Sequence, residues 1–256
     1  MSQFLKKRLY DQVTHFIAEK HWEERDDDIE NSTHSTANAK AKNQKPSVSC
    51  FVSALKAAFE KVEEEVLKLD SLDHVGSTAC AVMIYEDEDE GLRTLLSANV
   101  GDSRAVLCRS GSAVDLTRDH KPGDEKEKSR ILSQGDSIEW DNDCKVHRVR
   151  NLSLARAIGD RYAKPAVSAE VEIKHFPVCE EDEFIVLASD GLYDVMSSQE
   201  VVTYVKRQME SELAGLSKDN AESRKLVLRR NMANRVAREA FRKGSADNIT
   251  VVMVWL

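Results

Sequence analysis

The stretch Phe184-Ile185-Val186-Leu187-Ala188-Ser189-Asp190-Gly191 decides how this chain folds. Its apolar first half is typical of a buried strand, and a carboxylate and a glycine follow where that strand should end. Glycine permits a tight turn and a close approach of the backbone, so the Asp190 carboxylate and the Gly191 backbone can both reach an ion. The sequence therefore predicts a strand with a candidate cation site at its end.

Three other aspartates stand close to the ends of predicted strands. Asp194 comes shortly after Asp190, Asp102 lies in a turn after an apolar run, and Asp247 precedes the apolar run 249–255. Carboxylates from separate segments are the oxygen ligands that Mg²⁺ and Mn²⁺ prefer. Aspartate is also favoured in turns for its own hydrogen bonds. The spacing alone leaves a metal site and a set of turn residues as open alternatives.

Length and charge limit the class of protein. The chain has 256 residues, of which 41% are hydrophobic, enough for one domain with a sizeable core. Its formal net charge of −8 would repel a phosphate backbone, so we expect no nucleic-acid partner.

The sequence also lacks membrane and disulfide signals. No apolar run approaches the roughly 18 residues of a membrane span, and the amino terminus has no apolar signal core. The 5 cysteines are scattered without a C-x-x-C pair, which indicates neither a disulfide framework nor a zinc site. We expect a soluble monomer in the cytoplasm, the nucleus or both, with no membrane partner.

The hydrophobic periods separate helices from strands along the chain. Helical spacing predicts helices over residues 4–22, 48–69, 124–134, 198–214 and 219–242. Strand patterns occupy residues 78–85, 94–100, 105–108, 145–149, 184–189 and 249–255.

The connections indicate the fold class. Hairpin turns are expected at the acidic run 86–91 and at Gly101-Asp102, while residues 24–47 lack any period and are expected to form a polar loop or linker insertion. Residues 161–175 have no clear period either. Segregated strands and helices with hairpin connections predict a single α+β domain with antiparallel sheets.

Six short motifs occur in one order along the chain. They are Gly76-Ser77-Thr78-Ala79, Asn99-Val100-Gly101-Asp102-Ser103-Arg104-Ala105, Leu116-Thr117-Arg118-Asp119-His120-Lys121-Pro122, Leu154-Ala155-Arg156-Ala157-Ile158-Gly159-Asp160, Ser189-Asp190-Gly191-Leu192-Tyr193-Asp194 and Ala246-Asp247-Asn248-Ile249-Thr250. Together they resemble the metal-dependent protein serine/threonine phosphatases of type 2C (the PPM-type family). The resemblance covers roughly residues 1–256 and predicts phosphoserine and phosphothreonine proteins as substrates.

The resemblance implies a fold and a chemistry. The fold is a four-layer αββα sandwich, in which two antiparallel β-sheets are flanked by α-helices. Two Mg²⁺ or Mn²⁺ ions hold a bridging water that attacks phosphorus, since paired metals lower the pKa of water and neutralise phosphate oxygens. The family also has a variable flap beside its cleft, which corresponds to residues 161–175 here.

Residue by residue, the resemblance assigns roles to the aspartates. Asp190 and Asp247 resemble ligands of one core metal, with the Gly191 backbone beside them. Asp102 and Asp194, together with Asp190, resemble the ligands of a third, weaker ion.

Other motif residues are expected to support the site or the fold. Thr78 and Asn248 are expected to support the site by packing and hydrogen bonding. Arg156 and Asp160 are expected to tie a loop together, and His120 is expected to be structural.

Two signatures of the family do not occur in the sequence. One is an amino-terminal arginine followed by adjacent acids, and the other is Asp-Gly-His-Gly-Gly. Asp190-Gly191 is the only Asp-Gly pair, and no histidine is followed by glycine. The resemblance places the phosphate-binding arginine, the bridging aspartate and the catalytic histidine in these signatures, so the catalytic residues of this chain are unknown. The run Phe4–Leu9 resembles the helix that follows the second signature, so we expect the domain over 1–256 to lack its first strands.

Three hypotheses follow for the function. The first is a phosphatase whose chain is incomplete and whose activity is absent or severely impaired. At most one partly liganded core metal site and a weak third site would then remain. The second is a phosphatase-like module that binds or regulates a partner without catalysis. The third is an unrelated protein that binds divalent cations.

Overall fold

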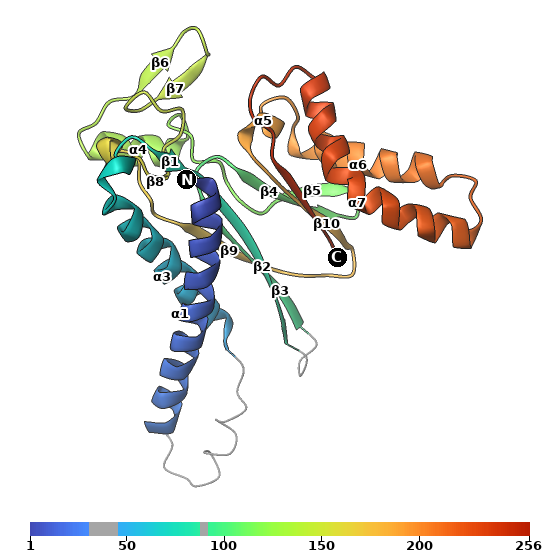
Figure 1. Ribbon diagram of the computed structural model, residues 1–256, viewed down its shortest axis with the longest axis horizontal. Helices are drawn as coiled ribbons and strands as arrows, with labels where there is room; N and C mark the ends of the chain where they lie inside the picture. The colour runs from blue at the N-terminus through green and yellow to red at the C-terminus, as the bar shows by residue number, and fades with distance from the viewer. Residues whose placement is uncertain (31–45, 88–91) are drawn as a thin grey trace. The chain divides into compact units, whose positions relative to one another are not determined.

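The computed structural model describes residues 1–30, 46–87 and 92–256 (Figure 1). Its contacts divide the chain into two compact units, each described here by itself. The first unit consists of residues 1–79, 83–101 and 120–177. The second unit consists of residues 80–82, 102–119 and 178–256.

Two long helices form one layer of the first unit. Helix α1 (Ser2–Glu30) lies beside helix α3 (Val48–Leu67), whose amino terminus is capped by the Ser47 hydroxyl accepting the Cys50 N–H. The two helices are joined by an ion pair of 2.6 Å between Arg8 and Glu65. Helical spacing puts the apolar side chains of α3 on one face. That face buries Phe51, Leu55, Phe59, Val62 and Val66 against Leu5 of α1 and against Leu96, Ala98 and Val100 of the neighbouring sheet.

The sheet beside these helices has the order β2-β3-β9. Strand β3 (Leu92–Val100) pairs antiparallel with β9 (Glu172–Pro177), in a register that sets Ala98 opposite Ile173. Strand β2 (Ala79–Asp87) is the other neighbour of β3. The sheet belongs to the first unit apart from Cys80–Val82 of β2.

Short elements complete the first unit. They are η1 (Asp70–Leu72), β1 (Gly76–Ser77) paired with β8 (Ile158–Gly159), helix α4 (Glu125–Ser133), β6 (Glu139–Asp141) paired with β7 (Val146–Arg148), and η2 (Arg161–Ala163). The Asp124 carboxylate caps α4 by accepting the N–H groups of Lys126 and Glu127, a favoured start for a helix.

The second unit is built on a four-stranded antiparallel sheet of order β11-β10-β4-β5. Its strands are β4 (Arg104–Arg109), β5 (Ser112–Asp115), β10 (Asp182–Ala188) and β11 (Val251–Trp255). Short helix α5 (Asp190–Tyr193) follows β10, and helices α6 (Ser198–Leu213) and α7 (Lys218–Arg242) pack together along the sheet (Figure 1). A capping box between Ser197 and Glu200 fixes the start of α6.

The core of the second unit lies between the sheet and these two helices. Its fully buried members come from both layers, since alternate strand residues and one helix stripe face each other. They include Val106, Cys108, Phe184 and Val186 of the strands and Val201, Val205, Met232 and Val236 of the helices. None of the helices in the described part of the chain is long and apolar enough to cross a membrane.

The α+β class with antiparallel sheets flanked by helices is confirmed, and most predicted elements occur close to their expected bounds. All five cysteines are free, as predicted. The predicted turn at residues 86–91 lies mostly outside the described residues. Short strands β5 and β6 were not predicted, because each has only three or four residues and lacks a measurable period.

Three predictions were wrong. Residues 24–30 were expected in a loop, but α1 continues to Glu30, since no glycine or proline interrupts the helix even though it lacks an apolar stripe there. The remainder of that loop, 31–45, lies outside the described residues. Gly101-Asp102 does not close a hairpin, because β3 pairs with β2 and β9 while β4 pairs with β5 and β10. The aperiodic stretch 161–175 contains the start of β9.

One buried ion pair links the segments of the first unit. Glu127 of α4 is fully buried, and one of its oxygens accepts hydrogen bonds of 3.0 and 2.7 Å from Nε and Nη2 of Arg156. Its other oxygen accepts from Arg130 Nε at 3.1 Å. Burial alone raises the pKa of Glu127, but the Arg156 hydrogen bonds and charge outweigh burial and lower that pKa to about 2. Arg156 ties its loop to α4, as predicted.

We expect Glu127→Gln to lower the free energy of unfolding by about 3 kcal/mol, because it removes the closest carboxylate of the mostly buried Arg156 and leaves, among the described carboxylates, only Glu170, at 3.9 Å. The folded pKa of Glu127 is depressed from its usual 4.5, so its contribution to stability is complete above pH 4.5 and is lost as the pH falls toward 2. Urea unfolding at several pH values should show this dependence in the native chain and not in the variant. Glu125→Gln, an exposed change on the same helix, is the control, and an equal loss there would contradict the assignment.

Candidate metal-binding site

The predicted aspartates of the second unit lie at one end of its central strands. Ala188, the last residue of β10, is paired with Arg104 at the start of β4 and with Val251 at the start of β11. Asp102 comes two residues before β4, and Asp190 two residues after β10. Antiparallel pairing therefore brings the segments that carry Asp102, Asp190 and Asp247 to the same end of three adjacent strands.

Asp190 begins a single helical turn that also carries Asp194. Ser189 is the amino-terminal cap residue of α5, Asp190 is its first residue, and Asp194 is its last cap residue. The Asp194 N–H donates to the Asp190 carbonyl at 2.8 Å, which closes the turn. Residues four apart on a helix lie on the same face, so both carboxylates project from one side of α5.

Gly191 brings α5 against the segment that carries Asp247. A Cβ atom at Gly191 would lie 2.6 Å from the Asn248 carbonyl oxygen and 3.4 Å from the Asp247 Cβ. No side chain fits at the shorter of these distances, so this close approach requires glycine. The contact places the backbone of Asp190-Gly191 directly beside Asp247.

Two serines fasten these segments together. Ser245 is buried, and its hydroxyl donates to the Gly191 carbonyl at 2.6 Å. The Ser189 hydroxyl donates to the Asn248 carbonyl at 3.0 Å and accepts the Thr250 N–H at 3.1 Å. Sequence reasoning missed both residues, although Ser189 directly precedes Asp190 and Ser245 lies two residues before Asp247.

The carboxylates differ in exposure and in hydrogen bonding. Asp102 is only 2% exposed, whereas Asp247 is exposed and Asp190 is half-buried. Asp190 Oδ1 accepts the Gly191 N–H at 2.9 Å, and Asp247 Oδ1 accepts the Asn248 N–H at 2.6 Å.

An arginine holds α5 against the sheet. The Arg104 guanidinium lies over the Tyr193 ring with 4.5 Å between Cζ and the ring centroid, and it donates to Asp119 at 2.9 and 2.7 Å. Burial raises the pKa of the Tyr193 hydroxyl, which therefore stays protonated. These contacts fix the face of α5 that carries Asp190 and Asp194.

Two motif residues of the first unit support the turn at Gly101. A Cβ at Gly101, whose φ is +107°, would lie 2.3 Å from Thr78 Cγ2, so the threonine methyl packs on this glycine. The Gly101 N–H donates to Nδ1 of the fully buried His120 at 3.1 Å, and the His120 N–H donates to the Gly101 carbonyl at 3.0 Å. His120 therefore has a structural role, as predicted.

The described residues do not by themselves complete a metal site. They contain no group of three or more His, Cys, Asp or Glu side chains arranged to hold a metal ion. Hard divalent cations take at least six oxygen ligands, and Mg²⁺ demands nearly ideal octahedral geometry. Asp190 and Asp247 could therefore supply only part of the ligands of an ion, and we derive no catalytic step from a bound metal.

Comparisons with known proteins identify the family of this chain. The chain matches the family described as Protein phosphatase 2C over residues 9–249. It is 38% identical over 204 residues to "Probable protein phosphatase 2C 59" of Oryza sativa subsp. japonica, covering 79% of this chain and 54% of the relative. It is 37% identical over 209 residues to the Arabidopsis thaliana protein of the same name, covering 81% of this chain and 59% of the relative. The chain thus spans a little over half the length of these curated relatives.

Solved structures show the same fold. Serine-threonine phosphatase 2C from Toxoplasma gondii aligns with a TM-score of 0.65 at 21% identity, over 98% of this chain and 80% of that one. A C. elegans sex-determining protein aligns with a TM-score of 0.63 at 27% identity, over 84% of this chain and 48% of that one. The chain belongs to the type 2C protein phosphatase family.

We expect Ser245→Ala to lower the free energy of unfolding by about 1–3 kcal/mol, because the Gly191 carbonyl then lacks its buried donor. Urea unfolding followed by circular dichroism measures this loss. Ser211→Ala removes an exposed hydroxyl from α6 and should change stability by less than about 0.5 kcal/mol. Equal stability of the two variants would contradict the fastening role of Ser245.

Proposed function

We propose that this chain supplies one side of the metal site of a Mg²⁺- or Mn²⁺-dependent protein serine/threonine phosphatase. The observation that carries the proposal is the close packing of Gly191 on Asp247-Asn248, which sets two acidic segments side by side at the strand ends. Cations favour such a place, since two neighbouring carboxylates repel each other until an ion lies between them. The substrates would be proteins that carry phosphoserine or phosphothreonine.

In this proposal the four aspartates divide into two groups. Asp190 and Asp247 bind one core ion, with the Gly191 backbone beside it. Asp102 and Asp194, together with Asp190, bind a weaker ion, and Thr78 and Asn248 support the site. Within this chain, the buried serine and the glycine contact hold these groups in position before any ion binds.

We propose further that residues 1–256 alone turn over substrate poorly or not at all. A bound pair of ions would supply an activated water and neutralise the phosphate oxygens. The sequence holds neither Asp-Gly-His-Gly-Gly nor the arginine-and-acids signature, so it offers no bridging carboxylate and no phosphate-binding arginine. The second hypothesis, a binding module without catalysis, makes the same prediction for turnover. We place the protein in the cytoplasm or nucleus as a monomer, in keeping with the sequence.

We expect the chain to bind Mn²⁺ weakly, because most positions around each ion would be filled by water. Isothermal titration calorimetry should detect this binding, and the double variant Asp190→Asn/Asp247→Asn should abolish it. Glu181→Gln/Glu222→Gln removes two exposed charges from the same unit and should leave the affinity unchanged. Undiminished binding by the double aspartate variant would refute the ligand assignment.

We expect no Mn²⁺-dependent release of phosphate from a phosphothreonine peptide by this chain. Malachite-green detection over hours, with an active type 2C phosphatase as positive control, measures this. Turnover that disappears in Asp190→Ala would show that the chain is catalytically complete, and would overturn the predicted impairment. Turnover that persists in Asp190→Ala would instead place the activity elsewhere.

A further inference from the structure

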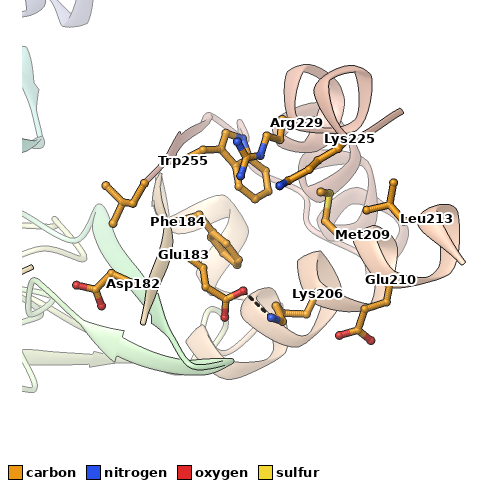
Figure 2. Close-up of a pocket in the computed structure, with 11 residues that line it drawn as sticks. Asp182, Glu183, Phe184, Lys206, Met209, Glu210, Leu213, Lys225, Arg229 and Trp255 are labelled. Atoms are coloured by element: carbon orange, nitrogen blue, oxygen red, sulfur yellow. Dashed lines mark hydrogen bonds and ion pairs between the residues drawn. The ribbon is translucent and has the colours of Figure 1, made fainter. Parts of the chain in front are cut away.

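A groove opens in the second unit at the far end of the strands from the candidate metal residues. It has a volume of about 520 Å³ and lies between α6, α7 and the ends of β10 and β11 (Figure 2). Phe184 lines it, whereas Asp190 lies six residues further along the chain. At about 3.4 Å per strand residue the two places are roughly 20 Å apart.

Apolar side chains form the floor and one wall of the groove. Phe184 and Trp255 are partners across β10 and β11, with 5.2 Å between their ring centroids. Met209 and Leu213 stand one turn apart on α6 and face the same space. An apolar groove of this size accepts one or two aliphatic or aromatic side chains.

Two cations lie over this apolar floor. Lys225 and Arg229 stand one turn apart on α7, and both are directed toward the Trp255 ring (Figure 2). Arg229 Cζ is 4.9 Å from the ring centroid, and its Nε is buried with no hydrogen-bond partner in the described structure. A buried donor without an acceptor is costly to the fold and favours a ligand that supplies one.

Several neighbouring cations are paired with carboxylates. Lys206, on the opposite wall, is held by Glu183 at 2.5 Å. Arg224 and Arg235, on the same helix, both pair with Glu212. Across the described residues, neither Lys225 nor Arg229 has an ion pair with a carboxylate. The Glu210 carboxylate lines the groove but points away from these two cations (Figure 2).

We propose that this groove binds a short acidic segment of a partner protein, with an Asp or Glu side chain against Lys225 and Arg229. An adjacent aromatic or aliphatic side chain of that segment packs on the partly buried Trp255 and Met209. Charge complementarity selects this occupant, because Lys225 and Arg229 have no carboxylate partner among the described residues, lie beside an apolar surface, and can each donate a hydrogen bond to a carboxylate oxygen. A polyanion such as a nucleic acid would meet only two cations on a protein of net charge −8.

Selection from a random dodecapeptide library displayed on phage, with the metal-free chain immobilised, tests the proposal. The enriched peptides are then synthesised, and their dissociation constants are measured by fluorescence polarisation. We expect peptides that combine Asp or Glu with an aromatic or branched aliphatic residue. Replacing the acid in such a peptide by its amide should weaken binding at least about tenfold, and this readout does not depend on the folding of a protein variant.

Matched protein variants locate the contact. Lys225→Gln/Arg229→Gln should weaken binding at least about tenfold. Arg230→Gln/Arg238→Gln, which removes two exposed charges from the same helix outside the groove, should change it less than about twofold. Asp190→Asn should leave peptide binding intact, so this result is independent of the proposed phosphatase site.

Three outcomes would overturn the proposal. One is selection that yields no peptide, and another is peptides that bind the Lys225→Gln/Arg229→Gln chain as well as the native one. The third is self-association in sedimentation equilibrium that is lost in that variant, which would assign the groove to a second copy of the chain.

Discussion

The second unit depends on the pairing of β10 with a strand on each side. Because β4 and β11 are both antiparallel to β10, the register of one strand fixes where the other two begin. A shift by one residue would turn Phe184 and Val186 out of the core and would move the aspartates away from their common end. Core packing therefore positions residues that themselves contribute little to the core.

The same register separates two kinds of chemistry. At one end of β10, the glycine contact and two serine hydroxyls hold acidic segments together in a polar setting. At the other end, the cross-strand pair of Phe184 and Trp255 makes an apolar floor below the cations of α7. The aspartates beyond one end of β10 and the α7 cations near its other end stay apart, because the length of the strand lies between the two places.

In the first unit, buried polar hydrogen bonds hold segments together that are distant in the sequence. Arg156 donates to Glu127 and to the Glu170 carbonyl, while His120 holds the Gly101 turn by two hydrogen bonds. These bonds connect α4, the loop before β8 and the end of β3, which are distant in sequence. A network of this kind needs every partner present, since each buried charge is stable only while its counter-charge remains.

The sequence could predict the elements with strong periods, namely α3, α6, α7 and β10, because burial selects their apolar spacing. It could not predict which strands pair with β3. The turn residues Gly101-Asp102 are compatible with a hairpin between β3 and β4, whereas the actual pairing depends on strands that are distant in the sequence. The end of α1 was missed for a different reason: the helix contains no glycine or proline and continues where its amphipathic pattern stops. The motifs led to Asp190 and Asp247 as candidate ligands, but the contact made by Ser245 was not predicted. Ser245 bonds to a carbonyl more than fifty residues away in the chain, and nothing in the local sequence distinguishes a serine that makes such a contact from any other serine.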